Sequence, residues 1–215
     1  MKTKVALFLL LIIGFIQAQK RPDLARFKTT QEKLSTWEKY CKALTEEEKY
    51  SLLITETDTG INLSKNLPEF LAQFYFFKGY GYEYTNNQYV KAVMYYEKSL
   101  ELAQKYKNLR LETSNLMRLN YMYYSVKDHE KGRKLIEYVK SIVDTVKDQD
   151  SKATMLGSIG EYYLDRSEFE NFITYKLKAI NFLLADEKPA EMKGNNNGVS
   201  YLQIADAYND MGQDE

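Results

Sequence analysis

The sequence contains almost none of the residues that build metal centres and disulfide frameworks. Its 215 residues include one cysteine, Cys41, and one histidine, His129. A single cysteine excludes an intrachain disulfide and a thiolate metal cluster, and a single histidine excludes a His-rich metal site. We therefore expect no metal and no other cofactor. Cys41 follows a helical pattern and is expected to be an inert, buried or half-buried thiol, whereas His129 is expected to be an exposed turn residue.

Helix breakers and an excess of either charge are also scarce. The chain has 3 prolines and 10 glycines, and its 30 basic residues balance 30 acidic ones. Nucleic-acid binding usually requires a basic excess, so we predict no nucleic-acid partner. No Gly-rich phosphate loop, zinc-ligand spacing or nucleophile elbow is present. The acidic run Glu46–Glu48 suits the start of a helix better than an acid–base pair, and we predict that the protein is not an enzyme.

The first residues have the composition of an export signal. Lys2 and Lys4 precede the almost wholly apolar run Val5–Ile16, and the small residue Ala18 follows it. The run is much shorter than the roughly 20 residues that span a bilayer, which predicts a cleaved signal peptide at 1–18. The mature chain would be exported across the inner membrane, to the periplasm or to the extracytoplasmic side of a membrane protein. We predict no membrane span within 19–215.

Apolar residues recur at helical spacing through the rest of the chain. Thr45–Glu48 and Ser167–Glu170 have the pattern of a capping box, in which side chains satisfy the free amides at a helix start. Pro68 suits a first helical residue. The segment Glu187–Gly198 contains a proline, two glycines and three consecutive asparagines, which predict a loop. The expected helices cover about 23–43, 46–65, 68–85, 88–106, 109–126, 129–147, 151–165, 168–185 and 198–211.

Two patterns recur at a fixed period. Positions 92, 132 and 172 align similar segments and are 40 residues apart. Upstream of each lies a large residue, then another three positions on, a small residue beside it and an aromatic residue three further. These three copies are Phe77, Tyr80, Gly81 and Tyr84; Leu116, Leu119, Asn120 and Tyr123; and Leu156, Ile159, Gly160 and Tyr163. A fourth copy, after position 172, is Tyr201, Ile204, Ala205 and Tyr208. A small residue lets the two helices of a pair approach closely. Each pair then has an apolar side against which the next pair can stack.

These patterns resemble those of the tetratricopeptide repeat (TPR) family, with a period of about 40 where the family has about 34. The resemblance implies an all-α, right-handed superhelical solenoid of antiparallel helix pairs. We expect repeats at 67–107, 108–148 and 149–186, a half-repeat at 198–211, and a helical cap or degenerate repeat at 19–66. Asn120 stands where the family has glycine, and Gly132 and Phe172 stand where it has a small alanine.

The resemblance also implies an inner groove, lined by first-helix residues that face away from the packing motif. Tyrosine suits such a groove, because it offers a large flat surface and a polar tip at a low entropy cost. The aromatic runs Tyr82–Tyr84 and Tyr121–Tyr124 must each serve both the core and another surface, since neighbouring residues point different ways on a helix. The candidate ligand-binding residues are Tyr75, Lys78, Tyr82, Asn86, Ser114, Met117, Tyr121, Tyr124, Thr154, Glu161, Asp165 and Asp206.

These features together predict a module that binds a protein or a peptide outside the cytoplasm. The export signal and the repeats resemble the exported repeat region of some bacterial sensors and transcription regulators, which favours the sensory or interaction part of a larger signalling protein. The half-repeat at 198–211 lacks a second helix, so we expect the chain to be a fragment. The alternative is a free-standing periplasmic scaffold or assembly factor. A glycan-acting enzyme would require a distinguished pair of carboxylates, and the sequence offers none.

Overall fold

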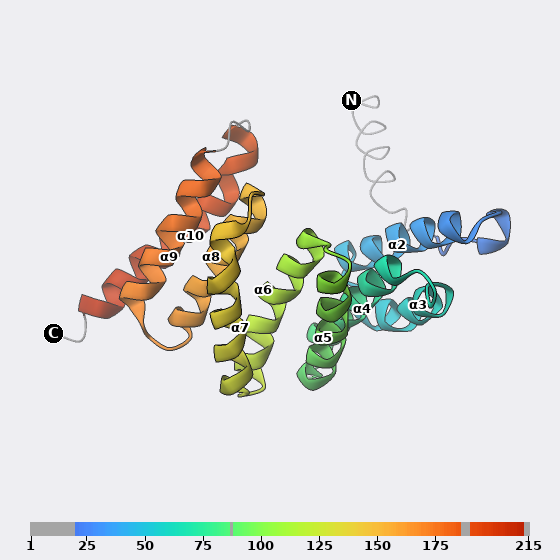
Figure 1. Ribbon diagram of the computed structural model, residues 1–215, viewed down its shortest axis with the longest axis horizontal. Helices are drawn as coiled ribbons and strands as arrows, with labels where there is room; N and C mark the ends of the chain where they lie inside the picture. The colour runs from blue at the N-terminus through green and yellow to red at the C-terminus, as the bar shows by residue number, and fades with distance from the viewer. Residues whose placement is uncertain (1–19, 87, 186–189, 213–215) are drawn as a thin grey trace, which may run out of the picture.

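The structure is a computed structural model that describes residues 20–86, 88–185 and 190–212. Within these ranges the regular structure is entirely helical, and the helices follow one another as antiparallel pairs in a row from α2 and α3 at one end to α9 and α10 at the other (Figure 1). The expected all-α solenoid of helix pairs is therefore confirmed. Every helix in the described part of the chain is too short or too polar to cross a membrane.

The central helices lie close to their expected positions. Pro68 is the first residue of α4, as predicted. The N–H of a first helical residue has no partner within the helix, so proline costs no hydrogen bond there. The 3-10 turn η2 (Val143–Thr145) extends α7 and accounts for the longer helix expected there. The bounds are α4 (Pro68–Glu83), α5 (Tyr89–Lys105), α6 (Leu109–Ser125), α7 (His129–Ile142), α8 (Gln149–Leu164) and α9 (Phe169–Ala185).

The first helix is shorter than its apolar pattern predicted. A 3-10 turn, η1 (Leu24–Arg26), precedes α2 (Thr30–Glu46), and α3 covers Tyr50–Leu63. A capping box starts α2: the Thr29 hydroxyl accepts from the Glu32 amide, and the Glu32 carboxylate accepts from the Thr29 amide. This reciprocal cap fixes the start of the helix at residue 30 rather than at 23.

Both predictions of a capping box, at Thr45–Glu48 and at Ser167–Glu170, were wrong. Thr45 lies in the last turn of α2, where its hydroxyl donates to the Lys42 carbonyl. Glu48 and Ser167 are left-handed, with φ of 56° and 58°. Each follows a helix C-terminus, and the amide of the next residue closes the turn: Lys49 donates to the Leu44 carbonyl and Glu168 to the Tyr163 carbonyl. The same turn, with left-handed Lys107 and Lys127, ends α5 and α6.

The last helix is longer than expected. The segment Glu187–Gly198 was predicted to be a loop, but α10 covers Ala190–Gly212, while residues 186–189 lie outside the described residues. Asparagine and glycine in a helix cost only about 1 kcal/mol each or less relative to alanine. Packing further along the same helix outweighs that cost, because Ile204 and Ala207 are buried against Phe172 and Ile180 of α9.

The small residue of the repeat motif marks close contacts between helices. A Cβ atom at Gly81 would lie 2.7 Å from Ile54 Cγ1 on α3, and one at Gly160 would lie 3.5 Å from the Phe172 carbonyl oxygen on α9. Asn120 holds the equivalent position in α6, and its amide donates to the Ser158 carbonyl on α8 at 3.0 Å. At this position α6 therefore has a side-chain hydrogen bond to the next repeat, where α4 and α8 have a glycine packed against a neighbouring helix.

Candidate functional site

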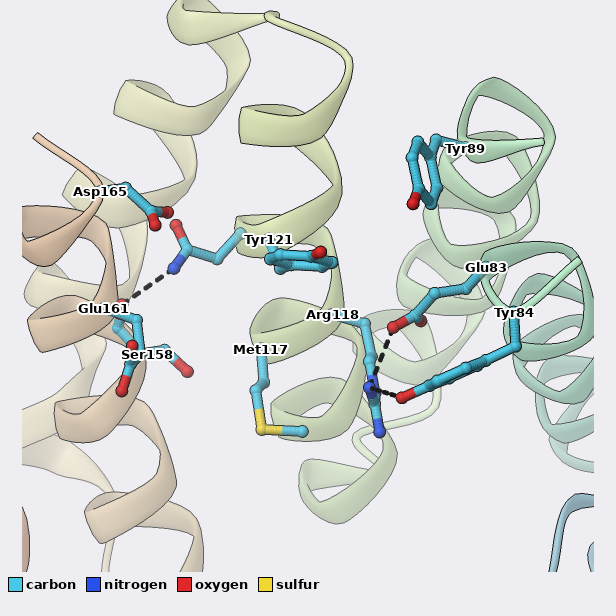
Figure 2. Close-up of a pocket in the computed structure, with 10 residues that line it drawn as sticks. Glu83, Tyr84, Tyr89, Met117, Arg118, Tyr121, Ser158, Glu161 and Asp165 are labelled. Carbon is cyan, nitrogen blue, oxygen red and sulfur yellow. Dashed lines mark hydrogen bonds and ion pairs between the residues drawn. The ribbon is translucent and has the colours of Figure 1, made fainter. Parts of the chain in front are cut away.

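A cleft of about 600 Å³ crosses the first helices of three consecutive pairs, α4, α6 and α8. Figure 2 shows Met117 and Tyr121 projecting from α6 between residues of α4 and α5 on one side and residues of α8 on the other. The cleft brings together four of the residues predicted from the sequence, Met117, Tyr121, Glu161 and Asp165. Its other lining residues are Glu83, Tyr84, Tyr89, Arg118, Asn120 and Ser158.

The predicted residues of α4 lie elsewhere. Tyr82 stacks on Tyr95 of α5, with ring centroids 5.6 Å apart, and Tyr75 lies 6.0 Å from the same ring. Lys78 is buried, forms an ion pair with Asp58 and lies 5.2 Å from the centroid of Tyr95. The neighbouring helices α3 and α5 therefore already hold these side chains.

The remaining predicted residues do not line the cleft. Asn86 is exposed in the turn between α4 and α5, with φ of 24°. Tyr124 on α6 and Asp206 on α10 are also exposed. Ser114 and Thr154 line a separate polar groove of about 540 Å³ between the starts of α6 and α8, together with Leu109, Arg110, Thr113, Asp148, Asp150 and Ser151.

A buried ion pair forms one side of the cleft. Arg118 on α6 donates to Glu83 on α4 at 3.0 Å and to the Tyr84 hydroxyl oxygen at 3.2 Å. Tyr96 on α5 donates its hydroxyl to the same carboxylate. Burial is the largest single influence on Arg118 and opposes its charge, but Glu83, Tyr96 and Tyr84 together outweigh burial and raise the pKa of the guanidinium. Burial, and then Glu83, raises the pKa of Tyr96, so this phenol stays protonated.

The opposite side of the cleft is acidic. Glu161 and Asp165 lie one turn apart at the end of α8, and Lys176 of α9 donates to Glu161 at 2.6 Å. Among the described residues, the Asp165 carboxylate has no hydrogen-bond or ion-pair partner. Burial raises the pKa of Asp165, the Glu161 carboxylate adds to this rise, and Arg166 partly offsets it. Asp165 also sits at the helix C-terminus, where a negative charge is unfavourable.

Exposed apolar side chains line the cleft: Tyr84 on the side of the ion pair, and Met117 and Tyr121 between the two sides. Tyr84, Met117 and Tyr121 are 46%, 39% and 52% exposed. In the run Tyr121–Tyr124, Met122 and Tyr123 are buried while Tyr121 and Tyr124 are exposed, so this run contributes to both the core and the surface. Tyrosine and methionine surfaces of this kind suit contact with another chain.

Sequence reasoning missed six of the lining residues. Glu83 and Tyr84 stand in an aromatic run that the sequence marked, and Tyr84 and Asn120 also stand in the repeat motif. The partnership of Glu83 with Arg118 depends on how α4 and α6 are placed relative to each other, and a motif within one repeat does not contain that information. The same holds for Asn120 and Ser158, which join α6 to α8.

The described residues contain no group of three or more His, Cys, Asp or Glu side chains that could hold a metal ion. Cys41 is buried, and burial raises the pKa of its thiol to about 12, with Glu56 and Glu38 adding to the effect. His129 is the exposed first residue of α7. The cleft is an aromatic and acidic surface.

Comparison with known proteins supports the architecture. No family model and no curated protein matches the chain. The crystal structure of the apo form of RapI matches with a TM-score of 0.56 and 14% identity, over 86% of this chain and 54% of RapI. That of BtubC (BKLC) from P. vanneervenii matches with a TM-score of 0.63 and 13% identity, over 84% of this chain and 72% of BtubC.

The chain shares a helical-repeat fold with both proteins. It spans about half of the length of RapI. At these identities the likeness concerns the fold alone, so the function has to be argued from the residues of the cleft.

Proposed function

We propose that this protein is a binding module for a protein or peptide, and that the cleft across α4, α6 and α8 receives an extended segment of the partner. Helical solenoids present extended surfaces of this kind, built from equivalent faces of successive repeats. The cleft lies across the first helices of three successive pairs, α4, α6 and α8. Its volume of about 600 Å³ accommodates a few side chains of a partner.

The observation that carries the proposal is the state of Asp165. Its carboxylate is half-buried, lies next to Glu161 and ends a helix, and each of these circumstances destabilises its charge. Folding alone gives no reason for a charge there. A cationic group of a partner would compensate all three costs at once, so we infer that a lysine or arginine side chain binds at Asp165.

The rest of the cleft is consistent with a partner that is both basic and apolar. Arg118 pairs with Glu83, and Lys176 pairs with Glu161, so the charge left without a partner in the cleft is negative. Tyr84, Met117 and Tyr121 supply the exposed apolar area beside it. Aromatic side chains that combine area with low flexibility commonly dominate binding energy at interfaces.

The carboxylates of the cleft do not suit glycoside hydrolysis. A glycoside hydrolase needs two carboxylates, one of them free to give or take a proton at the substrate. Glu83 and Glu161 are each held in an ion pair. Of the carboxylates that line the cleft, only Asp165 is outside an ion pair, and one such carboxylate is not enough for this reaction.

We further propose that the module works outside the cytoplasm, as the interaction part of a larger signalling protein. This rests on the signal-like residues 1–18. The intact mass of the protein recovered from its native envelope tests the export step: a chain that begins at residue 19 supports it, and a chain that retains residue 1 contradicts it. A coding sequence that continues into a membrane span would favour the signalling role, and one without a span would favour a scaffold or assembly factor.

A peptide selection tests the binding proposal. Random displayed peptides would be selected on the wild-type protein, on Asp165→Asn and on the control Asp206→Asn, which changes an exposed aspartate outside the cleft. We expect the wild type and the control to enrich peptides that combine a lysine or arginine with apolar residues. Asp165→Asn should lose the basic preference. Failure to enrich any peptide, or an unchanged basic preference in Asp165→Asn, would contradict the proposal.

A further inference from the structure

A second cavity, of about 370 Å³, lies away from the cleft, among α7, η2, α8 and α9. Val143 and Leu156 form its apolar floor, and both are buried. Its other lining residues carry charge or an aromatic ring: Lys140, Asp144, Lys152, Tyr175, Lys178 and Phe182. Its volume is in the range of small-molecule sites, about 300–1,000 Å³.

The cavity has a surplus of positive charge. Three lysines line it against the single carboxylate of Asp144. That carboxylate lies 3.8 Å from Lys152, and its side chain is 92% exposed, so the pair is weak and readily exchanged. Among the described residues, Lys140 and Lys178 have no carboxylate partner.

Aromatic rings position each of the three ammonium groups. Lys140 lies 4.7 Å from the ring centroid of Tyr163, Lys178 lies 5.0 Å from that of Tyr175, and Lys152 lies 4.7 Å from that of Phe182. A ring face attracts a cation without neutralising it. Lys140 also donates one N–H to the Tyr163 hydroxyl, which leaves two of its three N–H groups for another acceptor.

We propose that this cavity binds a small molecule in which a phosphate monoester is joined to a planar ring. The surplus of two positive charges matches a phosphate monoester, which carries about −1.5 to −2 at pH 7. Lys140, Lys152 and Lys178 would donate to the phosphate oxygens, and the ring would lie on Val143 and Leu156. This site is independent of the acidic cleft and of the function proposed for it.

Titration of the full chain with three small probes at about 150 mM salt tests the proposal. Phenyl phosphate carries both the ring and the dianion, benzoate carries the ring with one charge, and inorganic phosphate lacks the ring. We expect phenyl phosphate to bind more tightly than either of the others. Adenosine monophosphate distinguishes the source of the phosphate: tighter binding than phenyl phosphate would assign a nucleotide, and weaker binding an aryl phosphate.

Two matched variants locate the binding. Lys178→Gln removes an exposed lysine of the cavity and should weaken phenyl phosphate binding by about tenfold, the loss of roughly one charged hydrogen bond. Lys134→Gln changes an exposed lysine of α7 outside the cavity and should leave the affinity unchanged. Thermal unfolding checks that both variants fold. The proposal is overturned if phenyl phosphate does not saturate, if benzoate or inorganic phosphate binds as tightly, or if both variants weaken binding equally.

Discussion

The guanidinium of Arg118 on α6 lies 3.0 Å from the carboxylate of Glu83 on α4, and these two residues are 35 positions apart in the chain. The Glu83 side chain is 5% exposed and that of Arg118 is 25% exposed. Tyr96 of α5 donates to the same carboxylate. One buried charge thus joins three helices from two successive repeats and fixes one side of the cleft.

Removal of the cation from this pair should destabilise the fold strongly. Arg118→Met leaves Glu83 charged and buried, and we expect the free energy of unfolding to fall by about 3 kcal/mol, at the low end for such pairs because part of Arg118 is exposed. The double variant Glu83→Gln/Arg118→Met should lose less, since no unpaired charge remains. Urea unfolding measures both.

The control for this experiment is Arg133→Met. Arg133 pairs with Glu130 and Glu137 on the exposed face of α7, so its removal should leave the urea midpoint unchanged. Equal effects of Arg118→Met and Arg133→Met would mean that the buried pair has no special structural role.

Two glycine substitutions should change stability in opposite directions. At Gly81 a new Cβ would meet Ile54 Cγ1 at 2.7 Å, and we expect Gly81→Ala to cost about 1–3 kcal/mol through overpacking. At Gly132 the nearest atom is Tyr123 Cβ at 3.7 Å, so Gly132→Ala should stabilise α7 by up to about 1 kcal/mol. Thermal and urea unfolding measure both; destabilisation of similar size at the two sites would contradict the close contact of α3 and α4.

The thiol of Cys41 should be unreactive in the folded protein. Burial raises its pKa from an ordinary value of 9.0 to about 12, so almost no thiolate forms at pH 8. Iodoacetamide should label it only after unfolding in guanidinium chloride. Because the folded pKa is the higher one, the stability that this group contributes is complete below pH 9 and is lost as the pH rises towards 12. Rapid labelling of the native protein at pH 8 would contradict this burial.

Asp165 should lower stability at neutral pH. Burial, and then Glu161, raises the pKa of this carboxyl from 3.8, so its stability contribution is complete below that value and is lost as the pH rises through the higher folded pKa. Asp165→Asn should therefore be as stable as the wild type or more stable at pH 7, with a smaller difference at pH 4. Thermal unfolding at both values measures this. A variant that is less stable at pH 7 would indicate that Asp165 has a structural role.

The sequence contained enough information to predict the helical solenoid. The spacing of 40 between positions 92, 132 and 172, and the small residue at Gly81 and Gly160, reflect helix contacts that the structure contains. The turns were harder to predict. Glu48 and Ser167 adopt left-handed conformations that usually signal glycine, so their sequences resembled helix starts although they follow helix ends.

The cleft could be predicted only in part. The repeat pattern assigned Met117, Tyr121, Glu161 and Asp165 to one surface, and the structure brings them together in the cleft, because position within a helix determines which way a side chain points. It could not place Tyr82, since the stacking partner Tyr95 lies on the second helix of the same pair. Contacts between repeats, such as that of Arg118 with Glu83, depend on the angle and distance between helices.

The most direct test of the binding cleft compares two tyrosines on one helix. Tyr121 and Tyr124 of α6 are 52% and 42% exposed, but only Tyr121 lines the cleft. Titration calorimetry would measure the dissociation constant of a selected basic peptide for the wild type, Tyr121→Ala and Tyr124→Ala. The account predicts that Tyr121→Ala weakens binding by about tenfold or more, as truncation of an aromatic anchor does, and that Tyr124→Ala leaves it unchanged. Equal loss in both variants, or loss in Tyr124→Ala alone, would contradict the cleft as the binding site.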